Sequence, residues 1–111
     1  SANDAHGYEV LWGIQGYIAI VRWNGGSGDY TPIYDPGLGS IPVPVNGDVF
    51  RAEINGNIIS AYRNGSLVVS QDVTVIGGTT WGSGHPGMGF WPVDGGIPGS
   101  MGYSSYQAGN L

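Results

Sequence analysis

The stretch from Asn46 to Asp72, NGDVFRAEINGNIISAYRNGSLVVSQD, constrains the fold most, because two Asn-Gly pairs separate short apolar runs. Type I′ hairpin turns need positive φ at both central residues, and Asn-Gly tolerates this better than other pairs. We therefore expect tight turns at Asn55-Gly56 and Asn64-Gly65. The stretch is predicted to form three short antiparallel strands in a meander.

The turn chemistry also predicts a register. A two-residue turn at Asn55-Gly56 pairs Ala52 with Ile59 and Phe50 with Ala61. Because strand side chains alternate between two faces, these four residues then share one apolar face. The other face carries a mixture of polar groups and one aromatic ring, from Arg51, Glu53, Ser60 and Tyr62.

The rest of the chain has the same character of short apolar runs between glycine-rich turns. It has 111 residues, 41% of them hydrophobic, with 22 Gly and 7 Pro. This length and composition predict one all-β domain over residues 8–111 after a polar lead-in at residues 1–7, with little or no helix. Further strands are expected at Tyr8–Ile14, Tyr17–Trp23 (central and covered on both faces), Asp29–Tyr34 (with Pro32 at an edge or bulge), Gly89–Val93 and Met101–Ala108.

The chain has few charged residues, and most of them are acidic. Charged residues make up 10% of the chain, lysine is absent, and three arginines face eight acidic residues to give a net charge of −5. Nucleic-acid backbones and anionic membrane surfaces need a clustered basic surface, so neither is an expected partner. No apolar run approaches the roughly 20 residues of a membrane span, so membrane insertion is not expected. The chain contains no cysteine, which excludes disulfides and thiolate metal sites.

Three segments carry a resemblance to a known family: GDVFRAEINGNIISAYRNG (47–65), SGHPGMGFW (83–91) and GYSSYQAGNL (102–111). They resemble the C-terminal part of bacterial concanavalin A-like lectin/glucanase domains, the laminin-G-like jelly rolls. The opening YEVLWGIQGYIAIVRWNG (8–25) resembles the middle strands of such domains. The resemblance implies an antiparallel, jelly-roll-like β-sandwich, which for this chain would have about eight strands.

The family's jelly rolls are usually longer, so this chain resembles a truncated or minimal version. Strand edges or one sheet face would then be uncovered. Such edges pair readily with other chains, so a homo-oligomer or a complementary chain is a candidate partner.

Catalytic signatures are weak. Retaining glycosidases need two carboxyls about 5 Å apart, and the Glu-x-Asp-x-x-Glu run of the related glucanases is missing. Glu9 and Glu53 are single carboxylates within strands, and His85 lies in a glycine-rich turn. These weak signals favour a noncatalytic protein over an enzyme, and a polysaccharide-active enzyme is the less favoured alternative.

Calcium is a candidate cofactor, because loop carboxylates and backbone carbonyls are the ligands that this cation prefers. The chosen metal candidates are Asp72 and Asp29, and Asp35 and Asp94 lie in similar positions. Single loop aspartates also commonly cap turns. The resemblance favours calcium slightly, because laminin-G-like domains often bind it.

Aromatic side chains give the best case for a ligand site. Sugar rings pack their C–H faces on Trp and Tyr, while nearby polar groups bind the hydroxyls. The expected ligand-binding residues are Trp81, Trp91, Tyr62, Arg51, Glu53 and Tyr34, whereas Trp12 and Trp23 lie within strands and are expected in the core. The alternative for the first set is that these side chains cover the opposite sheet or face water.

The leading functional hypothesis is a noncatalytic carbohydrate-binding or adhesion module that binds a glycan or polysaccharide. Its expected location is extracellular, or on a cell or particle surface. The main alternative is a structural, self-assembling β protein of a fibre, surface layer or virion.

Overall fold

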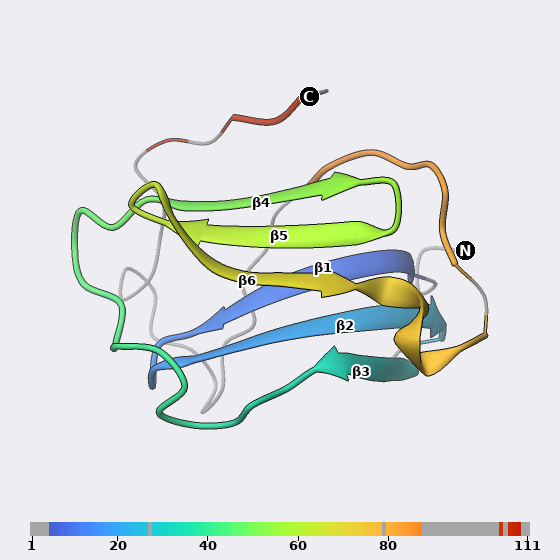
Figure 1. Cartoon of the computed structure of the whole chain (residues 1–111), viewed down its shortest axis with the longest axis horizontal. Coiled ribbons are helices and arrows are strands. Elements are labelled where there is room, and N and C mark those ends of the chain that lie inside the picture. Colours follow the sequence, from blue (N-terminus) through green and yellow to red (C-terminus); the bar gives the residue numbers. More distant parts are fainter. Residues whose placement is uncertain (1–4, 27, 79, 88–104, 106, 110–111) are drawn as a thin grey trace.

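The computed structural model describes residues 5–26, 28–78, 80–87, 105 and 107–109. This part of the chain folds into two antiparallel three-stranded sheets with almost no helix, so the prediction of an all-β chain is confirmed (Figure 1). The first sheet has the order β1-β2-β3 and the second the order β4-β5-β6. The strands are β1 (Ala5–Gly13), β2 (Tyr17–Gly25), β3 (Tyr30–Tyr34), β4 (Phe50–Asn55), β5 (Ile58–Arg63) and β6 (Ser66–Asp72), and a 3-10 turn η1 (Val73–Ile76) follows.

The first sheet is centred on β2, which pairs with β1 on one side and β3 on the other. Ile18 and Ile20 are buried on one face of β2, and Ala19 and Val21 are buried on the other. This confirms that the strand is central and covered on both faces. β1 begins at Ala5, three residues before the predicted start, and therefore includes the end of the expected polar lead-in.

β3 is an edge of the first sheet, and its register with β2 shifts at one point. Ile20 pairs with Tyr34 and Val21 pairs with Pro32, which leaves Ile33 as the extra residue of a bulge. Proline has no N–H for the ladder, so an edge position beside a bulge suits it. The expectation for Pro32 is confirmed.

The three-strand meander is confirmed in the second sheet, but its first turn differs from the prediction. Ala52 pairs with Ala61, not Ile59, because the two central turn residues are Gly56 and Asn57 instead of Asn55 and Gly56. Gly56 has φ of 61°, and Asn57 has no positive φ. A type II′ turn has glycine with positive φ at its first central position and a residue with negative φ at its second, as found here. The shift is two residues, so every side chain keeps its predicted face.

The second turn has the predicted form. Asn64 and Gly65 are its central residues, with φ of 53° and 83°, and Arg63 pairs with Ser66 across it. Positive φ at both central residues is the signature of type I′. Asn64 is the single non-glycine residue with positive φ in the described part of the chain.

The two sheets pack on each other through two small apolar clusters. One contains Ile18 and Ala61 together with Ile41 from the β3–β4 connection. The other contains Ile20, Ile59 and Val73. Trp12 packs against the first cluster, and its ring centroid lies 4.5 Å from that of Phe50. Its predicted place in the core is confirmed.

Two predicted C-terminal strands have different outcomes. Gly89–Val93 lies outside the described residues. For Met101–Ala108, the described residues Ser105, Gln107 and Ala108 are not in a strand, so that part of the prediction is wrong. No helix in the described part of the chain is long and apolar enough to cross a membrane.

Candidate functional site

The outer face of the second sheet carries the polar and aromatic surface expected from the sequence. Residues that alternate with the buried Ile59 and Ala61 point away from the first sheet. This surface, which we term the β4–β6 face, comprises Arg51, Glu53, Ile58, Ser60, Tyr62, Leu67, Ser70 and Asp72.

Three of these residues form a connected group around an aromatic ring. The guanidinium of Arg51 lies over the ring of Tyr62, with its Cζ 4.1 Å from the centroid. The hydroxyl of Tyr62 donates to Glu53 Oε1 at 3.0 Å. Arg51 and Glu53 approach each other to 3.9 Å, with 60% and 24% of their side chains exposed. The ring is therefore held at both ends, while the guanidinium stays open to solvent.

The surroundings of this group alternate between polar and apolar. The hydroxyls of Ser60 and Ser70 lie 3.2 Å apart and share a hydrogen bond across β5 and β6. Ile58 and Leu67 remain 39% and 58% exposed. The face thus offers guanidinium donors, carboxylate and hydroxyl acceptors and apolar carbon within one sheet surface, which is the combination that a hydroxyl-rich ring needs.

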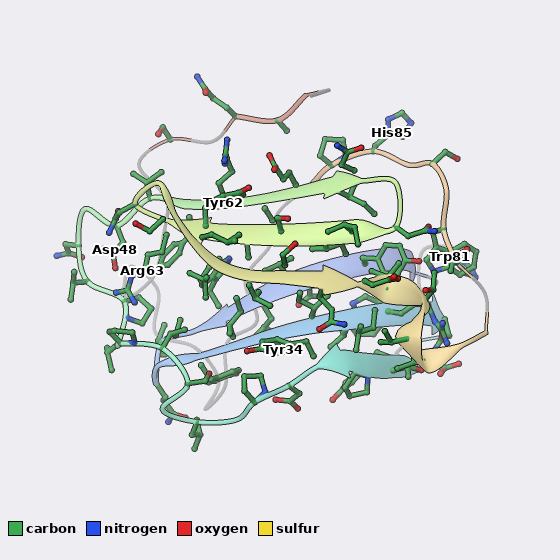
Figure 2. All side chains as sticks on the ribbon, in the orientation of Figure 1. Tyr34, Asp48, Tyr62, Arg63, Trp81 and His85 are labelled. Atoms are coloured by element: carbon green, nitrogen blue, oxygen red, sulfur yellow. The ribbon has the colours of Figure 1, made fainter. Side chains whose placement is uncertain are left out.

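The other predicted ligand residues do not join this group. Tyr34 packs between the sheets, against both core clusters. Trp81 lies at the far end of the molecule from the Asp48–Arg63 pair, well away from Tyr62 (Figure 2). Trp91 lies outside the described residues. Of the six candidates, the structure brings Arg51, Glu53 and Tyr62 together and separates Tyr34 and Trp81 from them.

Trp81 packs onto the first sheet instead. Its backbone N–H donates to the hydroxyl of Tyr8 at 3.0 Å, and its ring meets His6 edge-on with centroids 5.0 Å apart. Its indole Nε1 is buried and has no hydrogen-bond partner among the described residues. A ring held in this way is a packing residue and not an open platform for a sugar.

The two metal candidates are engaged in local structure. Asp72 is the N-cap of η1, where one carboxylate oxygen accepts hydrogen bonds from the backbone N–H and the hydroxyl of Thr74. These two bonds lower the pKa of Asp72. Asp29 accepts from the side-chain amide of Asn24. Within the described residues, no group of three or more His, Asp or Glu side chains is placed to hold a metal.

The carboxylates weighed for catalysis are far apart in the fold. Glu9 alternates with Tyr8 and Val10, which face the core, so it lies on the outer face of the first sheet. Glu53 lies on the outer face of the second. Two carboxylates on opposite surfaces cannot flank one glycosidic bond at about 5 Å. His85 is exposed.

One cluster was missed from the sequence. Trp23, expected in the core, is half-buried on the face of the first sheet that points away from the second sheet, where its Nε1 donates to Glu9 Oε2 at 2.8 Å. Its ring centroid lies 5.3 Å from that of Tyr30. The available signal was the position of Trp23 and Tyr30 on either side of the glycine-rich turn between β2 and β3, which makes them cross-strand neighbours.

Comparisons with known proteins give no relative for the chain. Protein-family models, curated proteins and solved structures were each searched, and none matches.

Proposed function

We propose that this chain is a noncatalytic carbohydrate-binding module that uses the β4–β6 face. The observation that carries the proposal is the group of Arg51, Tyr62 and Glu53, in which a tyrosine ring is fixed between a cation and a carboxylate on an exposed sheet. Guanidinium N–H groups donate in a planar fork and suit paired sugar oxygens. The exposed carbon of Leu67, opposite Tyr62 in the ladder, supplies the apolar contact.

The test is a glycan array followed by titration of the bound glycans against variants. Tyr62→Ala and Arg51→Ala should each weaken binding by about tenfold or more, because each removes a contact of the order of 1.4 kcal/mol. Trp81→Phe is the control and should bind like the wild type. Far-UV circular dichroism checks that the variants fold. Wild-type affinity in both β4–β6 variants, or an array without any bound glycan, would overturn the proposal.

The finer fold is part of this proposal. A concanavalin A-like jelly roll of about eight strands is supported by the two packed antiparallel sheets and by the sequence resemblance. A jelly roll contains two Greek keys, whereas the six described strands form two sequential meanders, one in each sheet. A module of this kind would act outside the cell or on a cell or particle surface.

A second candidate is a self-assembling structural protein, favoured by the exposed apolar side chains at one end of the molecule. The backbone N–H of Ile41 donates to Gly16 O and holds the β3–β4 connection against the β1–β2 turn. Large side chains at this end are exposed by more than half: Ile14, Leu38, Val43, Val45 and Val49. Contiguous exposed apolar surface commonly marks an interaction site.

Light scattering across a dilution series separates this candidate from a monomeric lectin. An assembly built on this end should lose mass when Leu38 and Val45 are both changed to serine. Val75→Ser is the matched control, because Val75 is 61% exposed but lies in η1. A monomer at every concentration would remove the support for assembly.

A further inference from the structure

β4 is the outermost strand of the second sheet, and its free edge is open to solvent (Figure 1). Among the described residues it pairs with β5 alone, and that pairing runs without a bulge from Phe50 to Asn55. Along the strand Arg51 and Ala52 are exposed, and Ile54 is 45% exposed. A regular, exposed edge offers a row of N–H and C=O groups to another strand.

The other three edge strands are less suited to such pairing. β3 carries Pro32 beside its bulge, and β6 has a shifted register with β5. In β1, residues 8–12 are all half-buried. Proline and bulges are common protections of sheet edges, and β4 contains neither. The unprotected edge of the two sheets is therefore β4.

The polar backbone groups of β4 divide between β5 and this free edge. The Asn64 N–H donates to Val49 O at 2.8 Å, and the Val49 N–H donates to the Asn64 side chain, so Val49 directs its polar groups toward the β5 side. Successive residues of an antiparallel ladder alternate in this respect. The N–H and C=O groups of Phe50, Ala52 and Ile54 therefore point to the free edge, where they have no backbone partner within the described residues.

A second copy of β4, running antiparallel, fits these groups in one register. With Ala52 opposite the partner's Ala52, Phe50 lies opposite the partner's Ile54, and all three free-edge residues are used. Centring the pair on Phe50 or Ile54 instead would leave at least half of the strand without a partner. The backbone alone thus favours the register centred on Ala52.

The same register brings opposite charges together on the β4–β6 face. Arg51 lies opposite the partner's Glu53 in a non-hydrogen-bonded pair, where side chains are closest and opposite charges stabilise the sheet. Within one chain, Arg51 reaches Glu53 at 3.9 Å, which is longer than a hydrogen bond. Tyr62 bonds to Glu53 Oε1, which leaves Oε2 for the partner's guanidinium. The edge is therefore complementary to a second copy of itself.

We propose that two copies of this chain pair through β4 about a two-fold axis at Ala52 and form one six-stranded sheet of order β6-β5-β4-β4-β5-β6. The two β4–β6 faces then lie side by side on one surface, because opposite residues of paired strands share a face. A contact of this kind is self-complementary and closes at two copies. It goes beyond the proposed glycan binding, and it differs from assembly through Leu38 and Val45.

Light scattering of the full chain across a dilution series, without any glycan, measures this association. The wild type should reach the mass of two chains. Arg51→Glu and Glu53→Arg should each raise the dimer Kd by about tenfold or more, because each turns two attractive cross-strand pairs into repulsive ones. An equimolar mixture of the two variants should recover the dimer, since every cross-strand pair again joins opposite charges. Asp35→Arg is the control, because it makes the same charge change as Glu53→Arg at an exposed position after β3 and should keep the wild-type Kd.

Cysteine cross-linking tests the register, in a chain that has no cysteine of its own. Ala52→Cys places two thiols in a hydrogen-bonded pair with Cα atoms about 5.5 Å apart, within the range of a disulfide. Ile54→Cys is the control on the same strand and face, and its two thiols would lie four residues apart, about 13 Å along the strands. Mild oxidation should therefore cross-link the first variant and not the second. Far-UV circular dichroism checks that every variant folds.

Three results would overturn the inference: a monomer at every concentration, a dimer that both charge variants leave intact, or equal cross-linking at positions 52 and 54. A dimer lost only when Leu38 and Val45 are both changed to serine would also overturn it, because the contact would then lie at the other apolar surface. Since no glycan is present, each outcome is independent of carbohydrate binding at the β4–β6 face.

Discussion

Arg63 on β5 donates to the carboxylate of Asp48 in the β3–β4 connection, with Nη2 2.7 Å from Oδ2. The same guanidinium donates to the carbonyls of Pro42 and Val43. One side chain thus fixes a connection that contains three prolines and has few ladder bonds of its own (Figure 2). The pair holds the chain where it passes from the first sheet to the second.

The stability of the fold should fall in acid through Asp48. Hydrogen bonds from the Val45 backbone N–H and the Asn64 amide, with the Arg63 contact, lower its pKa from 3.8 to about 2. A carboxyl with a depressed folded-state pKa stabilises the fold above its unfolded pKa and loses this contribution as pH falls toward the folded one. Urea unfolding should therefore show a declining free energy from about pH 4 to about pH 2. Asp48→Asn should flatten that decline, and an unchanged pH profile in this variant would contradict the assignment.

Asn64 should be far more sensitive to substitution than Asn57, although each lies in a tight turn. Asn64 has positive φ, accepts from the Val49 N–H at 2.8 Å and donates to Asp48 Oδ1 at 2.9 Å. Left-handed backbone costs an ordinary residue about 1–2 kcal/mol, so Asn64→Ala should destabilise by at least that amount. Asn57→Ala is the control and should change the free energy of unfolding by less than about 0.5 kcal/mol. Equal effects in denaturant titrations would refute the type I′ geometry.

Replacing Trp81 with phenylalanine should destabilise the fold less than replacing Trp23 with phenylalanine. Trp81→Phe removes a buried indole N–H that has no partner among the described residues, so the loss of contact area is offset and stability should stay within about 1 kcal/mol of wild type. Trp23→Phe breaks the bond to Glu9 and should cost about 1 kcal/mol more than Trp81→Phe. Thermal unfolding of both proteins measures the difference. If Trp81→Phe were the more harmful change, the assignment of the unpartnered donor would be wrong.

Gly13 should resist replacement because a ring occupies the space that its side chain would fill. Gly13 pairs with Tyr17 at the end of the β1–β2 hairpin, and an added Cβ would overlap the Tyr17 ring. Gly13→Ala should destabilise the protein by about 1–3 kcal/mol, the usual range for overpacking. Gly82→Ala is the control, since a Cβ there meets nothing within 4 Å. Partial recovery of stability in Gly13→Ala combined with Tyr17→Leu would identify the ring as the cause.

Local chemistry made much of the fold predictable. The Asn64-Gly65 turn, the edge position of Pro32 and the coverage of Tyr17–Trp23 each follow from φ preferences, a missing N–H or apolar runs over a few residues. The wrong prediction of the first turn also has a local cause. The run Asn55-Gly56-Asn57 permits a two-residue turn at either pair, and the observed β4–β5 pairing places the turn at Gly56-Asn57. The residues of the β4–β6 face were nevertheless predicted on the correct side of the sheet, since a shift of two residues preserves side-chain alternation.

The amino-acid sequence by itself determined the strands between Tyr8 and Asp72 and which of their side chains share a face, because alternation and turn geometry act between neighbours. Tertiary structure decided which faces became the interior. It placed Tyr34 between the sheets, turned Trp23 outward to Glu9, packed Trp81 on His6 and put Glu9 and Glu53 on opposite surfaces. These placements depend on how one sheet buries its apolar face against the other. That free energy comes from contacts between residues far apart in the chain, and no short motif encodes it.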